Sequence, residues 1–178
     1  MKFNLFNNPL MKSRSYPFIA YFFLLPILQV VVFDQFHLGT QLVPQVTLLF
    51  LIFYPTESNQ ALYLLVAFLY GFYLDILHST MGLQAAACVT VAFLRPFIIT
   101  SVFGKNHGYV NIRLQHTPLL ALSAYSLNIV LIHHLVYYVF GISSWTQWIR
   151  IIQQFIFGSL FTLLFLIAIM FFLRKNKQ

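Results

Sequence analysis

The sequence predicts an all-α membrane protein, a polytopic helix bundle that forms a single transmembrane domain over residues 1–178. Three observations lead to this fold class. Hydrophobic residues make up 60% of the chain and charged residues 7%, whereas soluble domains carry about 25% charged residues. About six spans of about 20 residues fit the length and leave too little chain for a folded extramembrane domain. Ten Lys and Arg residues outnumber three Asp and Glu residues, as in membrane proteins whose basic flanks set orientation.

The expected spans are apolar stretches separated by turn-forming or charged residues. The first lacks the small-residue cleavage site of a secretory signal and is expected to be retained. A tight turn over 79–82 joins the third span to the fourth. The longest internal loop, 104–117, precedes the fifth span, and Trp145 and Trp148 suit the membrane interface before the sixth. The spans cover about 17–36, 42–54, 61–77, 83–103, 119–140 and 151–173.

The second stretch, 42–54, is apolar but short for a span. It crosses if the bilayer thins locally or if the flanking Gln41 and Gln45 lie in the interface. A re-entrant segment is the alternative. Crossing is favoured because the distribution of charge then fits one orientation.

Basic residues mark one side of the membrane. With the N-terminus inside, eight of the ten Lys and Arg residues lie in cytoplasmic segments, Arg150 lies outside and Arg95 lies within a span. This asymmetry predicts an even number of spans with both termini in the cytoplasm. Basic residues of the loops and tail are expected to contact cytoplasmic partners or anionic lipid. Those candidates are Lys105, Arg113, Arg174 and Lys175.

Asp75 lies near the outer end of the third span, on one helix face with Gly71 and His78. The structural interpretation is that its carboxylate caps the following helix or binds amides of the turn that ends at Gly82. The functional alternatives are a contact with a partner or ligand, or a proton relay with the histidine. The structural interpretation is favoured because desolvation costs little near the interface.

Arg95 lies on a face of small residues in the fourth span and precedes Pro96, which is expected to kink the helix. The favoured expectation is that its side chain reaches towards the cytoplasmic interface. A hydrogen bond to Asn128, at a similar depth, is the alternative.

His133 and His134 lie next to each other in the fifth span. Adjacent helical residues point about 100° apart, unlike the i, i+4 pairs that hold zinc, so no metal is expected. Together with other polar residues of the outer half they could line an outward-facing pocket, although ordinary interfacial enrichment is favoured. The candidate pocket residues are Asp34, Gln84, His133, His134 and Gln154.

Catalytic signatures are missing from the sequence. It contains no phosphate-binding G-x-x-x-x-G-K-[ST], no nucleophile elbow G-x-S-x-G and no H-E-x-x-H. The single cysteine, Cys88, excludes an internal disulfide and a multi-cysteine metal site. We therefore expect neither an enzyme nor a bound cofactor, and no nucleic-acid partner.

The stretch from Gln41 to Arg95 resembles the MreD family of rod-shape-determining membrane proteins. The family pattern is a glycine, an aspartate four residues on and a glycine seven beyond, followed by Leu-x-Ala. Gly71, Asp75 and Gly82 match it. The Phe-Leu-Arg-Pro sequence that ends in Pro96 resembles the Bacteroidetes-like branch, and the resemblance covers about a third of the chain. The histidine at position 78 and the pair at 133–134 depart from the pattern.

The resemblance implies a non-enzymatic scaffold of the cell-elongation complex in the bacterial cytoplasmic (inner) membrane. Such proteins associate with MreC and, through it, with MreB, a RodA-type glycosyltransferase and a penicillin-binding transpeptidase in peptidoglycan synthesis. Their fold is similar to that of the substrate-binding subunits of energy-coupling-factor transporters. An alternative is therefore a small-molecule-binding transport subunit with an outward-facing polar pocket.

Overall fold

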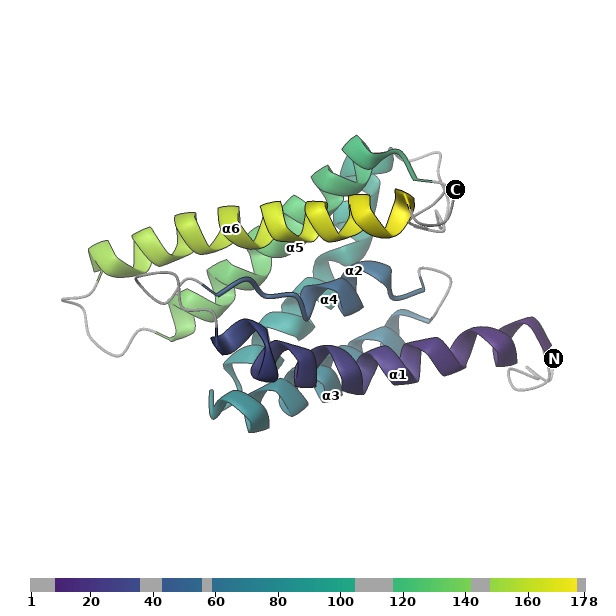
Figure 1. Cartoon of the computed structure of the whole chain (residues 1–178), viewed down its shortest axis with the longest axis horizontal. Helices are drawn as coiled ribbons and strands as arrows, with labels where there is room; N and C mark the ends of the chain where they lie inside the picture. The colour runs from purple at the N-terminus through teal and green to yellow at the C-terminus, as the bar shows by residue number, and fades with distance from the viewer. Residues whose placement is uncertain (1–8, 36–42, 56–58, 105–116, 142–147, 176–178) are drawn as a thin grey trace.

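A computed structural model of the chain describes residues 9–35, 43–55, 59–104, 117–141 and 148–175, and every regular element within them is helical (Figure 1). The long helices lie roughly along one axis and form a bundle. The elements are α1 (Pro9–Val31), the 3₁₀ turn η1 (Phe33–Gln35), α2 (Leu48–Phe53), α3 (Gln60–His78), α4 (Leu83–Phe103), α5 (Leu119–Phe140) and α6 (Trp148–Lys175).

Five of these helices, α1, α3, α4, α5 and α6, are long and apolar enough to cross a membrane. The expected helical, multi-pass architecture is confirmed at that level. The expected bounds 83–103 and 119–140 agree with those of α4 and α5, and α3 and α6 extend slightly beyond the expected 61–77 and 151–173. The first helix ends at Val31, before the expected 36, and the 3₁₀ turn follows it.

Residues 43–54, within the expected span 42–54, do not form a transmembrane helix. In the described part of the chain five helices, against the expected six or so, are long and apolar enough to cross a membrane. Only Leu48–Phe53 is helical, which gives a length of about 9 Å, far below the thickness of a bilayer core. Residues 43–45 precede it without regular structure. Five of the six residues of α2 are buried, so this short helix belongs to the core of the bundle rather than to its lipid-facing wall.

The segment 43–54 nevertheless runs back along the bundle. Its later residues meet earlier residues of α1 and α3, so it is antiparallel to both helices. The contacts are Val46 with Gln29, Tyr54 with Phe18, Thr47 with Tyr70 and Leu51 with Tyr63. Phe18 and Gln29 lie about 16 Å apart along α1. The segment therefore returns the chain over roughly half the thickness of a bilayer core, and α3 starts at the same end of the bundle as α1 (Figure 1).

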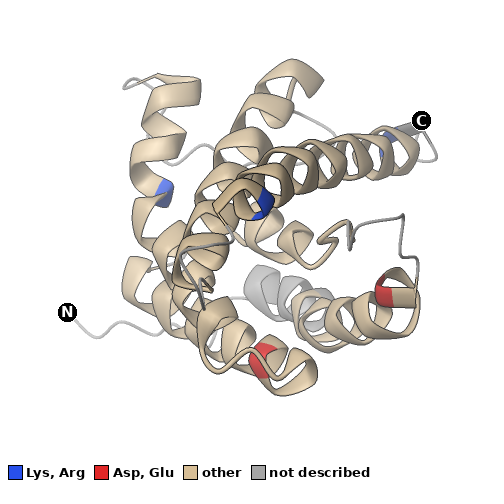
Figure 2. Ribbon diagram, turned by 90° about the vertical axis from the view of Figure 1, so that its left-hand side faces the viewer, with Lys and Arg blue, Asp and Glu red and all other residues tan. Residues whose placement is uncertain are grey.

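The helices pack in chain order, with α4 between α3 and α5, and α6 against α5. At one end, the Arg174 guanidinium donates to the Thr117 carbonyl (3.3 Å), joining the end of α6 to the start of α5; we call this the Arg174 end. The opposite end, the Asp34 end, holds Asp34, His78 and the α3–α4 turn. Figure 2 looks along the bundle from the Asp34 end and shows how few charged residues its described part carries.

Candidate functional site

The turn between α3 and α4 is organised by Asp75, which is 6% exposed. Its Oδ1 accepts the backbone N–H of Gln84 (3.0 Å) and its Oδ2 accepts that of Ala85 (2.9 Å). The Thr80 hydroxyl also donates to Oδ1. First-turn amides of a helix have no partner within the helix and favour negative charge. The geometry therefore supports the structural interpretation of Asp75, as a cap of α4 supplied by the preceding helix.

Gly71 and Gly82 serve the same hairpin for different reasons. A Cβ atom on Gly71 would lie 2.5 Å from the Cα of Ala85, so the two backbones touch there and only glycine fits. Gly82, just before α4, has φ +95°, a left-handed conformation that glycine adopts without strain. The three matched residues of the motif thus fix one helical hairpin.

Pro96 lies inside α4 and removes the N–H that would bond to the carbonyl of Ala92. The side-chain amide of Gln60, from the first turn of α3, donates to this carbonyl instead, at 2.7 Å. Besides the contact at Asp75, this hydrogen bond also joins α3 to α4, and it satisfies the Ala92 carbonyl that the proline leaves without a helical partner.

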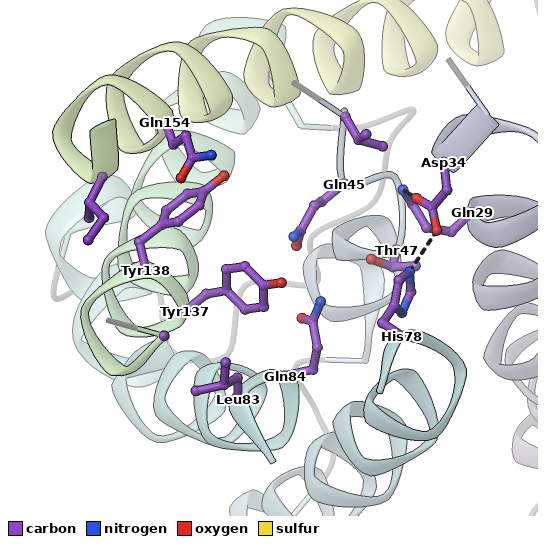
Figure 3. A pocket seen from close by; sticks show the side chains of 13 residues that line it. Gln29, Asp34, Gln45, Thr47, His78, Leu83, Gln84, Tyr137, Tyr138 and Gln154 are labelled. Atoms are coloured by element: carbon purple, nitrogen blue, oxygen red, sulfur yellow. Dashed lines mark hydrogen bonds and ion pairs between the residues drawn. The ribbon is translucent and has the colours of Figure 1, made fainter. Parts of the chain in front are cut away.

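A pocket of about 410 Å³ opens at the Asp34 end, bounded by α1, the segment 43–47, α3, α4, α5 and α6 (Figure 3). Of the expected pocket residues, Asp34, Gln84 and Gln154 line it, and so does His78. Several other polar residues that line the pocket were not expected there. These are Gln29, Gln45, Thr47, Tyr137 and Tyr138.

One wall of the pocket is a hydrogen-bonded network around Asp34. The His78 Nε2 lies 2.9 Å from Asp34 Oδ2, and the Gln29 amide donates to Oδ1 at 2.8 Å. The other ring nitrogen of His78 lies 2.9 Å from the Leu74 carbonyl. Both ring nitrogens thus face an acceptor, an arrangement that suits an imidazolium paired with the carboxylate. His78 therefore binds Asp34 of η1, and it joins η1 to α3.

Gln29 also holds the non-helical segment in place. Its Oε1 accepts the N–H of Val46 (2.9 Å) and its Nε2 donates to the Pro44 carbonyl (3.1 Å). On the other side of that segment, the backbone N–H of Gln45 donates to the hydroxyl of Thr162 in α6 (3.2 Å). Helix α1 and helix α6 thus satisfy backbone groups that a helical segment would have satisfied by itself.

His133 and His134, two of the candidate pocket residues, are not among the described residues that line the pocket. They are 0% and 1% exposed and lie among α4, α5 and α6. The His134 Nδ1 lies 2.9 Å from the Ser159 hydroxyl, and the His133 Nε2 lies 3.9 Å from the Cys88 sulfur. Within the described residues, no group of three or more His, Cys, Asp or Glu is placed to hold a metal ion. The two histidines therefore lie in the packing between helices, His133 towards α4 and His134 towards α6.

Arg95 is buried inside the bundle, and the partners that the structure gives it are residues other than Asn128. The arginine is 3% exposed. Its Nε donates to the Tyr125 hydroxyl (2.8 Å), an Nη atom donates to the Tyr54 carbonyl, and the guanidinium lies 4.5 Å from the centre of the Tyr63 ring. Asn128 bonds within its own helix. Arg95 therefore joins α4, α5 and the end of the segment 43–54 inside the bundle.

The basic residues expected to contact partners or lipid are only partly described. Arg174 is half-buried and lies at the Arg174 end, where it bonds the Thr117 carbonyl. Lys105 and Arg113 lie outside the described residues, as does the side chain of Lys175.

Some pocket residues carried a signal in the sequence. Gln29 is a polar side chain inside an apolar span, which is by default a candidate functional position. Gln45 flanks the second apolar stretch, where its polarity indicates only a place in the interface. Tyr137 and Tyr138 carry no such signal, since tyrosines near a span end are ordinary interfacial residues.

The described site combines amide, hydroxyl and imidazole–carboxylate groups around an open pocket, and these groups can bind a polar molecule by hydrogen bonds. Comparison of the chain with protein-family models, with curated proteins and with solved structures finds no match.

Proposed function

We propose that the chain is a non-enzymatic scaffold subunit of the bacterial cell-elongation machinery, in the cytoplasmic membrane. It binds an MreC-like protein and, through it, MreB filaments, a RodA-type glycosyltransferase and a penicillin-binding transpeptidase. The observation that carries the proposal is the α3–α4 hairpin. The residues of the resemblance, Gly71, Asp75 and Gly82, all act in the packing of that hairpin.

A scaffold needs a rigid frame with a fixed outer surface, and the hairpin provides one. The carboxylate of Asp75 binds two amides of the neighbouring helix, and Gly71 brings the two backbones into contact. Around this frame, large apolar side chains on α3 and α4 face outwards, among them Phe72, Ile76 and Phe93. These side chains are available to lipid and to the transmembrane helices of partners.

Depletion of the protein in the bacterium that encodes it tests the proposal. Cells are expected to lose their rod shape and become round, and the tagged protein is expected to co-purify with an MreC-like protein from solubilised membranes. Cells that remain normal rods after clean depletion, with no paralogue present, would contradict the proposal.

The pocket at the Asp34 end favours one alternative, a small-molecule-binding transport subunit. Polar side chains from five helices and from the segment 43–47 converge on its open volume (Figure 3). This function predicts a saturable ligand that raises the melting temperature of the purified protein. A broad metabolite screen without any shift would count against it, and would leave the scaffold proposal untouched.

A further inference from the structure

Two glutamine side chains direct amide groups into the pocket at the Asp34 end (Figure 3). Gln84 is 4% exposed. The Oε1 atoms of Gln84 and Gln45 are buried, and neither has a hydrogen-bond partner in the described part of the chain. Buried polar atoms are nearly always paired, because an unpaired one forfeits its bonds to water. Two orphaned acceptors on one pocket therefore call for a donor that comes from outside the described part of the chain.

Both amides project from backbone that is held by other helices. The N–H of Gln84 is fixed by the carboxylate of Asp75 (3.0 Å), and the N–H of Gln45 is fixed by Thr162 (3.2 Å). The residues on either side of Gln45 are both bonded to the side chain of Gln29. A binding group on a fixed backbone loses little freedom when a ligand arrives. The backbone that carries the two acceptors is thus preorganised.

The electrostatic character of the wall selects against charged ligands. Asp34 pairs with His78 (2.9 Å) and also accepts from Gln29, so its charge is compensated within the wall. Lys and Arg are absent from the described residues that line the pocket. A carboxylate or phosphate would leave water there without a counter-ion, which is costly. A cation would likewise meet a carboxylate that is already paired, because Asp34 binds His78 and Gln29. The wall therefore fits an uncharged molecule.

Size and shape narrow the ligand further. A volume of about 410 Å³ lies near the lower limit for ligand sites, which span about 300–1,000 Å³. The rings of Tyr137 and Tyr138 form one side of the pocket, with both hydroxyl groups on its surface (Figure 3). Aromatic rings with polar edges suit flat or hydroxylated molecules.

We infer that this pocket binds a small uncharged molecule that carries N–H or O–H donors, such as an amide or a polyol, with Gln45 and Gln84 as the acceptors. The inference rests on the alternative function, ligand binding, and is independent of the scaffold proposal.

Two matched pairs of probes test the inference on the full chain in lipid nanodiscs: nicotinamide with nicotinate, and glucose with glucuronate. Each pair keeps the size and exchanges a neutral group for a carboxylate. The neutral member of at least one pair is expected to raise the melting temperature by about 3–6 °C at ten times its Kd. The carboxylate member is expected to give no shift. A larger shift with the carboxylates overturns the ligand class. No shift with any probe at saturating concentration means a pocket that holds water alone, and overturns the inference.

Substitutions locate the binding. Gln84→Leu and Gln45→Leu are expected to abolish the shift, whereas Gln153→Leu, an exposed neighbour on α6 outside the pocket, is expected to retain it. If the leucine variants fail to fold, Gln84→Met keeps the unbranched shape of the side chain and the backbone bond to Asp75 but removes the acceptor. It is expected to weaken binding of the neutral probe at least tenfold. Wild-type binding by every variant would place the ligand elsewhere. Association with an MreC-like protein, measured in the same preparations, reports on the scaffold function separately.

Discussion

Replacing Gly71 by alanine places a Cβ atom inside the backbone of α4. The new atom would lie 2.5 Å from the Cα of Ala85, 2.7 Å from the carbonyl oxygen of Gln84 and 2.8 Å from the N of Ala85. Ordinary contact begins at 3.4 Å, so the helices must separate locally by about 0.9 Å. Separation also stretches the bonds from Asp75 to the amides of Gln84 and Ala85, which now measure 3.0 and 2.9 Å.

Gly158→Ala is the matched control. Both glycines are helical, so both substitutions gain about 1 kcal/mol of helix propensity. At Gly158 the nearest atom is the Tyr138 hydroxyl oxygen, 3.0 Å away, which belongs to a side chain that can rotate. Overpacking of a rigid contact costs about 1–3 kcal/mol, so the Gly71 variant is expected to be less stable than the control by that amount. For a chain of this length the difference corresponds to about 2–12 °C in melting temperature.

Thermal unfolding of both variants in the same detergent measures the difference. Intrinsic fluorescence or loss of monodisperse protein after heating serves as the readout. If Gly71→Ala melts at or above the temperature of Gly158→Ala, the close approach of α3 and α4 does not limit residue 71, and the reasoning about the hairpin fails.

Three further outcomes follow from the described contacts. Asp75→Asn leaves one oxygen for two amides and removes the charge at the start of α4, so a loss of about 1–3 kcal/mol is expected in denaturant titration; an unchanged midpoint would contradict the cap. Asp34→Asn and His78→Gln, combined in a double-mutant cycle, are expected to show a coupling energy of about 0.5–1 kcal/mol, since the pair is partly exposed; strictly additive effects would refute the pairing. Gln60→Met removes the donor to the Ala92 carbonyl, and hydrogen exchange in the middle of α4 is expected to accelerate relative to wild type, whereas equal protection would show that the bond is dispensable.

The five long helices of the described residues could be predicted from the sequence because each contains an apolar stretch long enough for a span. The bounds of α4 and α5 follow from Gly82, Gly104 and Pro118, which interrupt the apolar pattern beside them. The role of Asp75 in the hairpin could also be predicted. Asp75 lies one turn before the end of its helix, and a tight turn that ends at Gly82 places the start of the next helix beside it.

The segment 43–54 could not be predicted because its partners are distant in sequence. Gln29 and Thr162 satisfy its backbone from either side, 17 and 117 residues away from their respective partners. The same reason explains Arg95. Its depth suggested a route to water, but a tyrosine 30 residues later in the chain and a carbonyl 41 residues earlier supply its bonds inside the bundle. The pocket likewise depends on Tyr137 and Tyr138, whose position near a helix end is unremarkable in the sequence.

The hydrogen bond from the N–H of Gln45 to Thr162 also bears on how the chain is assembled in the membrane. Backbone without its own helical bonds is tolerated at membrane depth only where protein surrounds it. During synthesis, residues 43–47 leave the ribosome long before α6 does. Until α6 is present, the backbone groups of this stretch must be hydrogen-bonded by water, by the insertion machinery or by another part of the chain. The last helix therefore supplies a contact that the first half of the protein needs. A chain that stops before Thr162 would lack the hydroxyl that holds Gln45 in the pocket wall.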